Sequence, residues 1–466
     1  RQRQMCIRDS DIIILEEIME SIWNGEVWIP PRKPLKENIS VETVIIGAGM
    51  AGVLTAYELR RRGKPCVILE AKRIGSGQTG NTTAKITSQH GMCYENMIQK
   101  SGIVKARQYA KANEEAIQAY EQIIEEGNID CEFQRCPAYL YSQVERECLQ
   151  QEAEAARQAG IDAEFTTKTA LPFPVEGAVK FRGQAQFHPL KFLKAVSEEL
   201  DIYEQTKVFK VEGNVLQTTG GTVEAGNIIF ACHFPFVNIP GYYFARMHQE
   251  RSYVVAVKQA QQLDGMYYGI DEEGLSFRNA GKLLLAGGGQ HRTGENQKGG
   301  RYEKLWEQIR QYWSGCKKTA CWSAQDCMTL DGIPYIGRFS EETEHWYVAT
   351  GFGKWGMSSS MVSAHLLADL ITHQISPYEE LFSPQRSITA EAVGNFLEDG
   401  MLSAKNLGKG LLDYQEKKRC THLGCELEWN PDEEVYECPC HGSRFDRNGK
   451  LLNNPALEDL SLKSSV

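Results

Sequence analysis

The stretch that decides the fold of most of the chain is VETVIIGAGMAGVLTAYELRRRGKPCVILEA, residues 41–71. The apolar, β-branched run at residues 44–46 is typical of a buried strand, and the residues after the glycine turn have the apolar spacing of a helix that Gly63 ends. A second apolar run, CVIL, follows that helix. Strand, tight turn, helix and strand in this order predict a βαβ unit, and therefore a parallel sheet covered by helices.

The turn inside this unit carries the pattern G-x-G-x-x-G at Gly47, Gly49 and Gly52. The first glycine permits the tight turn, the second lets a pyrophosphate approach the backbone, and the third lets helix and strand pack closely. Glu70 ends the second strand, where a carboxylate can accept hydrogen bonds from a ribose 2′-OH. Together these features predict dinucleotide binding, but NAD enzymes and flavoproteins share them, so the choice of dinucleotide stays open at this point.

Composition limits the remaining choices. The chain has 466 residues, which predicts two to four domains, and its 42% hydrophobic and 24% charged residues are typical of a globular protein. A formal net charge of −10 disfavours a nucleic-acid partner. No window is long and apolar enough for a membrane span, and no signal peptide is recognised, so we expect a cytoplasmic protein without integral membrane association. We exclude the first ten residues, RQRQMCIRDS, from the fold prediction as a candidate non-native stretch.

Three further motifs make residues 41–385 resemble the glycine oxidase and D-amino-acid oxidase (DAO) family of FAD oxidoreductases. They are RIGSGQTGNTTAK after Glu70, CMTLDGIPYIGR with Leu330 where proline is usual, and the turn GFGKWG. The resemblance implies FAD as the cofactor. Besides the first glycines and Glu70, it implies cofactor contacts from two later segments: Gly77, Thr79, Asn81, Thr82 and Thr83, and Gly351, Gly353, Gly356 and Met357.

The turn GFGKWG also matches G-x-G-x-x-G formally, which would indicate a second, NAD-binding unit. No further strand and no terminal acidic residue follow its helix, so half of that fingerprint is missing. We prefer the flavin interpretation, in which the N-terminus of this helix favours negative charge on the reduced flavin.

The same resemblance implies hydride removal from a carbon that bears an amine. That reaction requires a cation to orient a substrate carboxylate more than it requires acid–base groups. Candidates for this cation are Arg251, Arg278, Arg292 and Lys354, although a charged residue on such a strand is more often part of a rim salt bridge. The sequence assigns no catalytic residue.

Near the C-terminus, cysteines and histidines cluster in RCTHLGCELEWNPDEEVYECPCHGSRFD. The spacing C-x-H-x15-C-x2-H resembles the signature of a Rieske [2Fe–2S] domain. The resemblance implies that Cys420 and Cys438 bind one iron and that His422 and His441 bind the other. It also implies a disulfide between the remaining pair, Cys425 and Cys440. Zinc is the weaker alternative, since C-x-H is tighter than its usual ligand spacing.

We therefore expect an α/β flavoprotein, made of a Rossmann-like FAD domain and an α+β substrate domain, with a small all-β Rieske domain at the C-terminus. The expected divisions are an N-terminal extension (1–40), a discontinuous FAD-binding domain (41–95, 185–240 and 320–378), a substrate domain (96–184 and 241–319), a linker (379–410) and the Rieske domain (411–466).

The leading hypothesis is an FAD-dependent dehydrogenase that oxidises a small amine or amino acid. The reduced flavin would pass electrons one at a time to the [2Fe–2S] cluster, and the cluster would relay them to an unidentified external acceptor. Two alternatives remain: an oxidase that uses O₂ while its cluster is only structural, and a redox sensor based on the cluster.

Overall fold

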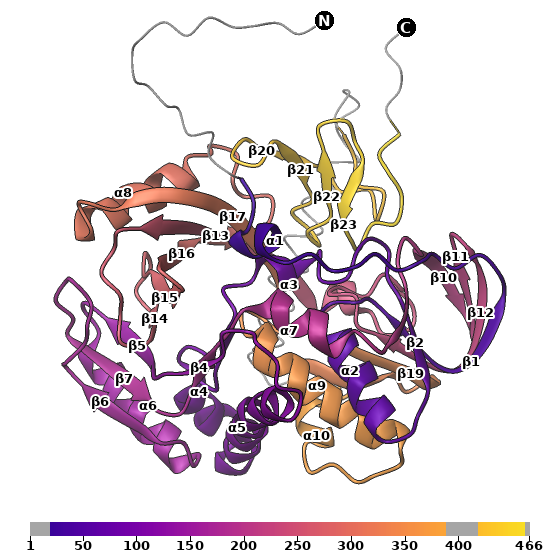
Figure 1. Cartoon of the computed structure of the whole chain (residues 1–466), viewed down its shortest axis with the longest axis horizontal. Helices are drawn as coiled ribbons and strands as arrows, with labels where there is room; N and C mark the ends of the chain where they lie inside the picture. Colours follow the sequence, from indigo (N-terminus) through magenta and orange to yellow (C-terminus); the bar gives the residue numbers. More distant parts are fainter. Residues whose placement is uncertain (1–18, 388–417, 462–466) are drawn as a thin grey trace, which may run out of the picture.

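The computed structural model describes residues 19–387 and 418–461. The first ten residues, most of the expected linker and both ends of the expected Rieske segment lie outside the described residues. The described part contains two large sheets and a small C-terminal sheet (Figure 1).

The first large sheet contains the βαβ unit predicted from residues 41–71. Strand β1 (Ile39–Ile46) pairs in parallel with β2 (Cys66–Leu69) on one side and with β12 (Gly221–Phe230) on the other. Parallel pairing continues from β2 to β9 (Asp201–Tyr203) and from β12 to β19 (Thr343–Thr350). Antiparallel strands complete the sheet: β10 (Val208–Glu212), β11 (Val215–Thr218) and β18 (Tyr335–Ser340). The helices α2 (Met50–Arg61) and α9 (Gly356–Ile371) pack against each other beside this sheet (Figure 1).

The second large sheet is antiparallel except where β14 pairs with β5. Its order is β17 (Lys317–Thr329), β13 (Met247–Lys258), β16 (Leu283–Arg292), β15 (Ser276–Ala280), β14 (Met266–Gly269), β5 (Ala138–Ser142), β7 (Gly177–Phe181) and β6 (Ala163–Thr166). The expected division at residue 320 falls inside β17, which pairs with β13 along its length and so lies in this second sheet.

The other elements of this part surround the two sheets. They are α1 (Ile22–Glu26), α3 (Gln78–Asn81), α4 (Cys93–Ser101), α5 (Ile103–Glu126), α6 (Arg146–Gln158), α7 (Pro189–Val196), the 3-10 turn η1 (Tyr243–Ala245), α8 (Arg301–Tyr312), α10 (Glu379–Phe382) and a small sheet of β3 (Lys85–Ile86), β8 (Ala185–Gln186) and β4 (Gln134–Arg135). The extension before β1 packs onto the body, because Trp23 is buried and its Nε1 donates to the carbonyl of Thr82 at 2.7 Å.

The C-terminal part is all-β, as expected. Its antiparallel strands are β20 (Glu428–Asn430), β21 (Val435–Glu437), β22 (Arg444–Asp446) and β23 (Leu451–Asn453). Its hydrophobic core is small and includes four buried cysteines beside Phe445. In Figure 1 this yellow domain lies at the top, between the second large sheet on the left and the first on the right. The α/β fold with a small all-β C-terminal domain is therefore confirmed.

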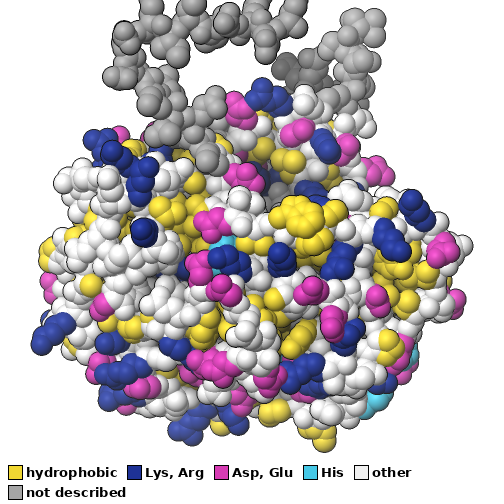
Figure 2. Space-filling view, viewed as in Figure 1, with side chains coloured by type: hydrophobic (Ala, Val, Ile, Leu, Met, Phe, Trp, Pro, Cys, Tyr) yellow, Lys and Arg dark blue, Asp and Glu magenta, His cyan; other side chains and the backbone are white. Residues whose placement is uncertain are grey.

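On the face shown in Figure 2, lysines and arginines are interspersed with aspartates and glutamates. Among the described residues, no helix is both long and apolar enough to cross a bilayer.

Candidate functional site

A cavity of about 1040 Å³ is lined by residues of both large sheets and of the C-terminal sheet. Its wall contains the turn after β1, the end of β2 and the segment at 72–83 from the first part of the chain. The second sheet contributes residues of β13, β15, β16 and β17, and the turn before α9 adds another side. Residues 450–454 of the C-terminal domain also line it, so this domain closes part of the same cavity.

The glycine turn after β1 has the geometry that its sequence predicts. Gly47 adopts φ +108°, which favours glycine, and it lines the cavity together with Gly49, the N-cap of α2. A Cβ at Gly52 would lie 2.0 Å from the carbonyl oxygen of Gly47, so only glycine permits this close packing of helix on strand. The first turn of α2 therefore presents backbone N–H groups toward the cavity, as a phosphate group requires.

Glu70 lies on the cavity wall at the end of β2. Its Oε2 accepts from the backbone N–H of Ala48 at 2.8 Å, and its Oε1 accepts from the N–H of Lys72 at 2.7 Å. Burial raises the pKa of this carboxyl group, whereas the two backbone N–H groups lower it. A carboxylate has about four lone-pair positions, so two remain for a ligand hydroxyl.

The predicted loop after β2 follows the same wall. Gly77, Thr79, Asn81, Thr82 and Thr83 all line the cavity. The side chain of Gln78, between them, accepts from the backbone N–H of Gln325 at 2.7 Å, and Trp322 Nε1 donates to the carbonyl of Asn81 at 2.9 Å. Strand β17 therefore fixes the position of this loop.

The turn before α9 lines the opposite side, with Gly351, Gly353, Gly356 and Met357 on the wall. Gly351 has φ +72°, and a Cβ there would lie 2.3 Å from Cγ2 of Thr329. Because α9 begins at Gly356, the positive end of its dipole faces the cavity.

Two of the predicted substrate-orienting arginines are neutralised or held away from the cavity. Arg251 lines it, but its guanidinium is buried and pairs with Glu433 of the C-terminal domain, with Glu437 3.7 Å away. Arg278 does not line the cavity, and its Nη1 donates to the carbonyls of Thr83 and Ala84 at 2.8 and 2.7 Å. A strand position in the sequence does not reveal either set of partners.

The other two candidates also have partners. Nε of Arg292 lies 3.4 Å from the carbonyl oxygen of Pro439, at the contact with the C-terminal domain. Lys354 lines the cavity, but its Nζ lies 3.1 Å from Oε2 of Glu250 and donates to Gln290. The sequence analysis missed another cation on this wall, Lys85, whose only signal is its place two residues after the loop threonines.

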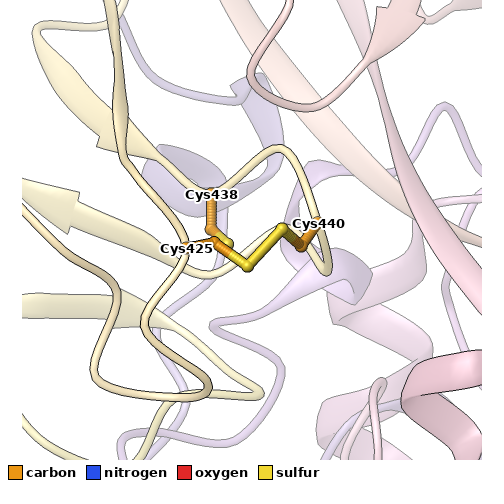
Figure 3. A group of neighbouring side chains, drawn as sticks. All are labelled: Cys425, Cys438 and Cys440. Carbon is orange, nitrogen blue, oxygen red and sulfur yellow. A yellow bond between two sulfur atoms is a disulfide. The ribbon is translucent and has the colours of Figure 1, made fainter. Parts of the chain in front are cut away.

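The cysteine and histidine cluster of the C-terminal domain lies at the contact with the second large sheet. Cys425 and Cys440 form a disulfide, and the sulfur of Cys438 lies within 4.8 Å of both (Figure 3). The thiols of Cys420 and Cys438 are free, buried and hydrogen-bonded to each other. The disulfide sulfurs of Cys425 and Cys440 are not available as metal ligands, so Cys420 and Cys438 are the two thiols that can bind a metal.

The rings of the two histidines, His422 and His441, meet edge to face beside this pair, with their centroids 4.9 Å apart. Nδ1 of His422 is buried and has no hydrogen-bond partner among the described residues, whereas its Nε2 is 2.8 Å from Oδ1 of Asn238. Burial lowers the pKa of His422 to about 4, so the imidazole is neutral at pH 7, as a metal ligand must be. Two thiols and two imidazoles are the donor set of a Rieske cluster, and the residues present fit that group.

The family model for FAD dependent oxidoreductases (DAO) matches residues 42–370, and the chain belongs to this family. The model for the Rieske [2Fe–2S] domain matches residues 414–464. FAD and a [2Fe–2S] cluster, the two expected cofactors, are thereby confirmed.

One relative matches nearly the whole chain, and two solved structures match about three quarters of it. The chain is 35% identical to the "Putative Rieske 2Fe-2S iron-sulfur protein YhfW" of Bacillus subtilis (strain 168), over 96% of this chain and 97% of that protein. The fold matches glycine oxidase from Geobacillus kaustophilus (TM-score 0.63, 21% identity, covering 75% of this chain and 99% of that one). L-proline dehydrogenase from P. horikoshii matches with a TM-score of 0.61, 19% identity, and 75% and 97% coverage.

Proposed function

We propose that this chain oxidises a small amine or amino acid at its FAD site and that its Rieske cluster relays the electrons to an external acceptor. The structural relatives include glycine oxidase, L-proline dehydrogenase and L-amino acid deaminase, which supports a substrate with a C–N bond next to the reacting hydrogen. Bound FAD would supply a two-electron acceptor for hydride.

The chain's own residues would hold and tune that cofactor. We propose that the turn at Gly47, Gly49 and Gly52 and the loop at 77–83 hold the pyrophosphate, and that Glu70 binds the ribose. The turn at 351–357 would place the dipole of α9 where negative charge develops on reduction. The C-terminal domain closes one side of the cavity, and so helps to exclude water from it.

The observation that carries the electron relay is a chain of contacts from the cavity wall to the cluster loop. His233 lines the cavity, and its Nε2 is 3.2 Å from Oε1 of Gln249. Gln249 is buried, and its Nε2 donates to the backbone carbonyl of His441 at 2.6 Å. His441 belongs to the predicted ligand set, so two hydrogen-bonded contacts separate the wall of the flavin cavity from the backbone of a cluster ligand.

Close packing holds this route in place. Gly442, next in the chain, has φ +79°, and a Cβ there would lie 2.7 Å from Cβ of Gln249. Gln325 Nε2 also donates to the Gly442 carbonyl, at 2.7 Å. No Cβ fits at Gly442 between the cluster loop and β13, so the loop packs directly against this strand.

An anaerobic titration tests the proposal. Purified holoenzyme would be mixed with a panel of amines and amino acids while flavin and cluster absorbance are followed together. We expect one substrate to bleach both signals in the wild type and only the flavin signal in Cys438→Ser. If substrate reduces the flavin and the cluster never bleaches, the relay is wrong. Full-rate peroxide production by Cys438→Ser in air would favour an oxidase with a structural cluster.

Two matched variants test the route itself. Gln249→Leu removes the side chain that joins His233 to the cluster loop, whereas Gln325→Leu removes a hydrogen bond to the same loop. We expect slower cluster bleaching in Gln249→Leu than in Gln325→Leu, with flavin reduction by substrate unchanged in both. Equal rates of cluster bleaching in the two variants would contradict this route.

A further inference from the structure

Asn238 places an amide oxygen against one of the predicted cluster ligands. Its Oδ1 lies 2.8 Å from Nε2 of His422. An amide oxygen can only accept a hydrogen bond, so this contact puts the ring proton of His422 on Nε2 and leaves Nδ1 with a lone pair. Nδ1 is buried and has no hydrogen-bond partner among the described residues. The tautomer that Asn238 selects is therefore the one that a metal ligand at Nδ1 requires.

The two residues come from different parts of the chain. Asn238 lies 184 positions before His422, in the segment between β12 and η1 of the flavoprotein part. Phe244 of η1 meets the ring of His422 edge to face at 6.4 Å and the ring of His441 at 5.8 Å. The segment 238–244 therefore packs against both imidazoles, with Phe244 as an apolar contact and Asn238 as a polar one.

The backbone around Asn238 holds its side chain at this contact. The N–H of Tyr242 donates to the carbonyl of Asn238 at 3.1 Å and closes a turn over the intervening residues. Asn238 does not line the flavin cavity, unlike His233 earlier in the same segment. A substitution at Asn238 therefore changes the surroundings of His422 and leaves the wall of the flavin cavity as it is.

We propose that Asn238 is a positioning residue that lowers the reduction potential of the Rieske cluster by accepting the distal N–H of His422. A metal-bound imidazole that donates its other N–H is a more basic ligand. A more basic ligand stabilises iron in its oxidised, more positively charged state, and so makes reduction of the cluster harder. The flavoprotein part thereby sets the potential of the cluster to which it would deliver electrons. This inference rests on the predicted ligand role of His422 and, through the relay, on the proposed function.

Two substitutions of Asn238 with opposite effects test this role in the holoenzyme. The midpoint potential of the cluster would be measured by anaerobic titration with dithionite and redox mediators, with the EPR signal of the reduced cluster as the readout. Asn238→Leu removes the acceptor. We expect it to raise the equilibrium constant for one-electron reduction about tenfold, the size of one hydrogen bond, which corresponds to 59 mV. Asn238→Asp keeps the shape and strengthens the acceptor, so it should lower the potential.

Asn454→Leu is the matched control at the contact between the two parts of the chain. Nδ2 of Asn454 donates to the backbone carbonyl of Cys232 at 3.0 Å and to that of Phe234. These acceptors belong to the flavoprotein part and neither is a predicted cluster ligand. We expect Asn454→Leu to leave the potential of the cluster unchanged, and we expect the flavin content to stay complete in both variants of Asn238.

Three results would overturn the proposal: an unchanged potential in Asn238→Leu, shifts of the same sign in Asn238→Leu and Asn238→Asp, or an equal shift in Asn454→Leu. If Asn238→Leu loses its cluster, the potential of Asn238→Asp decides, and an unchanged value there would also contradict the proposal. The proposed function can fail separately. In that case no amine or amino acid would reduce the flavin, although the titration with dithionite would still show the opposite shifts of the two Asn238 variants.

Discussion

The buried carboxylate of Glu433 should hold the Rieske domain against the flavoprotein. It pairs with Arg251 of β13 and with Arg444 of its own domain, and its Oε1 accepts from the hydroxyl of Tyr302 at 2.9 Å. Burial alone would raise its pKa, but the two arginines lower it from 4.5 to about 2. The substitution Glu433→Gln would keep the shape and remove the charge, leaving Arg251 with only the more distant Glu437.

The size of the effect follows from that pKa. A carboxyl group whose pKa falls from 4.5 to about 2 on folding contributes roughly 3 kcal/mol. Because the folded pKa is the lower one, this stabilisation is present above pH 4.5 and is lost as the pH falls toward 2. At neutral pH, Glu433→Gln should therefore weaken docking of the domain by about 100-fold, a value that breaking a buried ion pair also supports.

Hydrogen exchange can measure this loss at backbone groups that the Rieske domain covers. The N–H of Gly294 donates to Glu437 at 3.0 Å, and that of Arg301 donates to Asp432 at 3.0 Å. These two amides should exchange about 100-fold faster in Glu433→Gln. The matched control is Glu434→Gln, because Glu434 pairs with Arg447 on the surface and should change exchange little. Equal protection in both variants would refute the argument.

Two further outcomes are expected. Gly52→Ala should abolish flavin binding because its Cβ would lie 2.0 Å from a carbonyl oxygen, whereas Gly315→Ala, with no atom within 4 Å, should keep full flavin content; a flavin-loaded Gly52→Ala protein would contradict this. Replacing both Cys425 and Cys440 with serine opens a loop of 15 residues. The free energy of unfolding of the Rieske domain, measured in urea by loss of the cluster absorbance, should fall by about 3 kcal/mol while flavin content stays unchanged.

Local patterns predicted the parts of this protein that local forces determine. The positive φ of Gly47 and the close approach of Gly52 to the Gly47 carbonyl both lie within six residues, so the local sequence was enough to predict a βαβ unit. The Rieske domain was likewise recognisable from the local pattern of cysteines and histidines, and the family model matches residues 414–464; Cys420, His422, Cys438 and His441 stay the predicted ligands.

Contacts between distant residues were not predictable in this way. Arg251 looked like a substrate cation on a strand, but its partner Glu433 lies 182 positions further along the chain. Lys85 had no visible motif, and its Nζ contacts the carbonyl of Tyr267 and Oγ of Ser276, which lie 182 and 191 positions further along the chain. The sequence analysis assigned residues 320–378 to the FAD-binding domain, and the pairing of β17 with β13 in the second sheet could not be read from that one segment.

The most direct test of the central claim is flash photoreduction of the flavin in anaerobic holoenzyme with EDTA as the electron donor, followed by the absorbance of the cluster. This measurement needs no substrate. We expect the cluster to bleach as the reduced flavin is reoxidised, at a rate that does not change with protein concentration, because the route through Gln249 lies within one chain. A cluster that stays oxidised would contradict an internal relay. A bleaching rate that rises in proportion to protein concentration would contradict it as well.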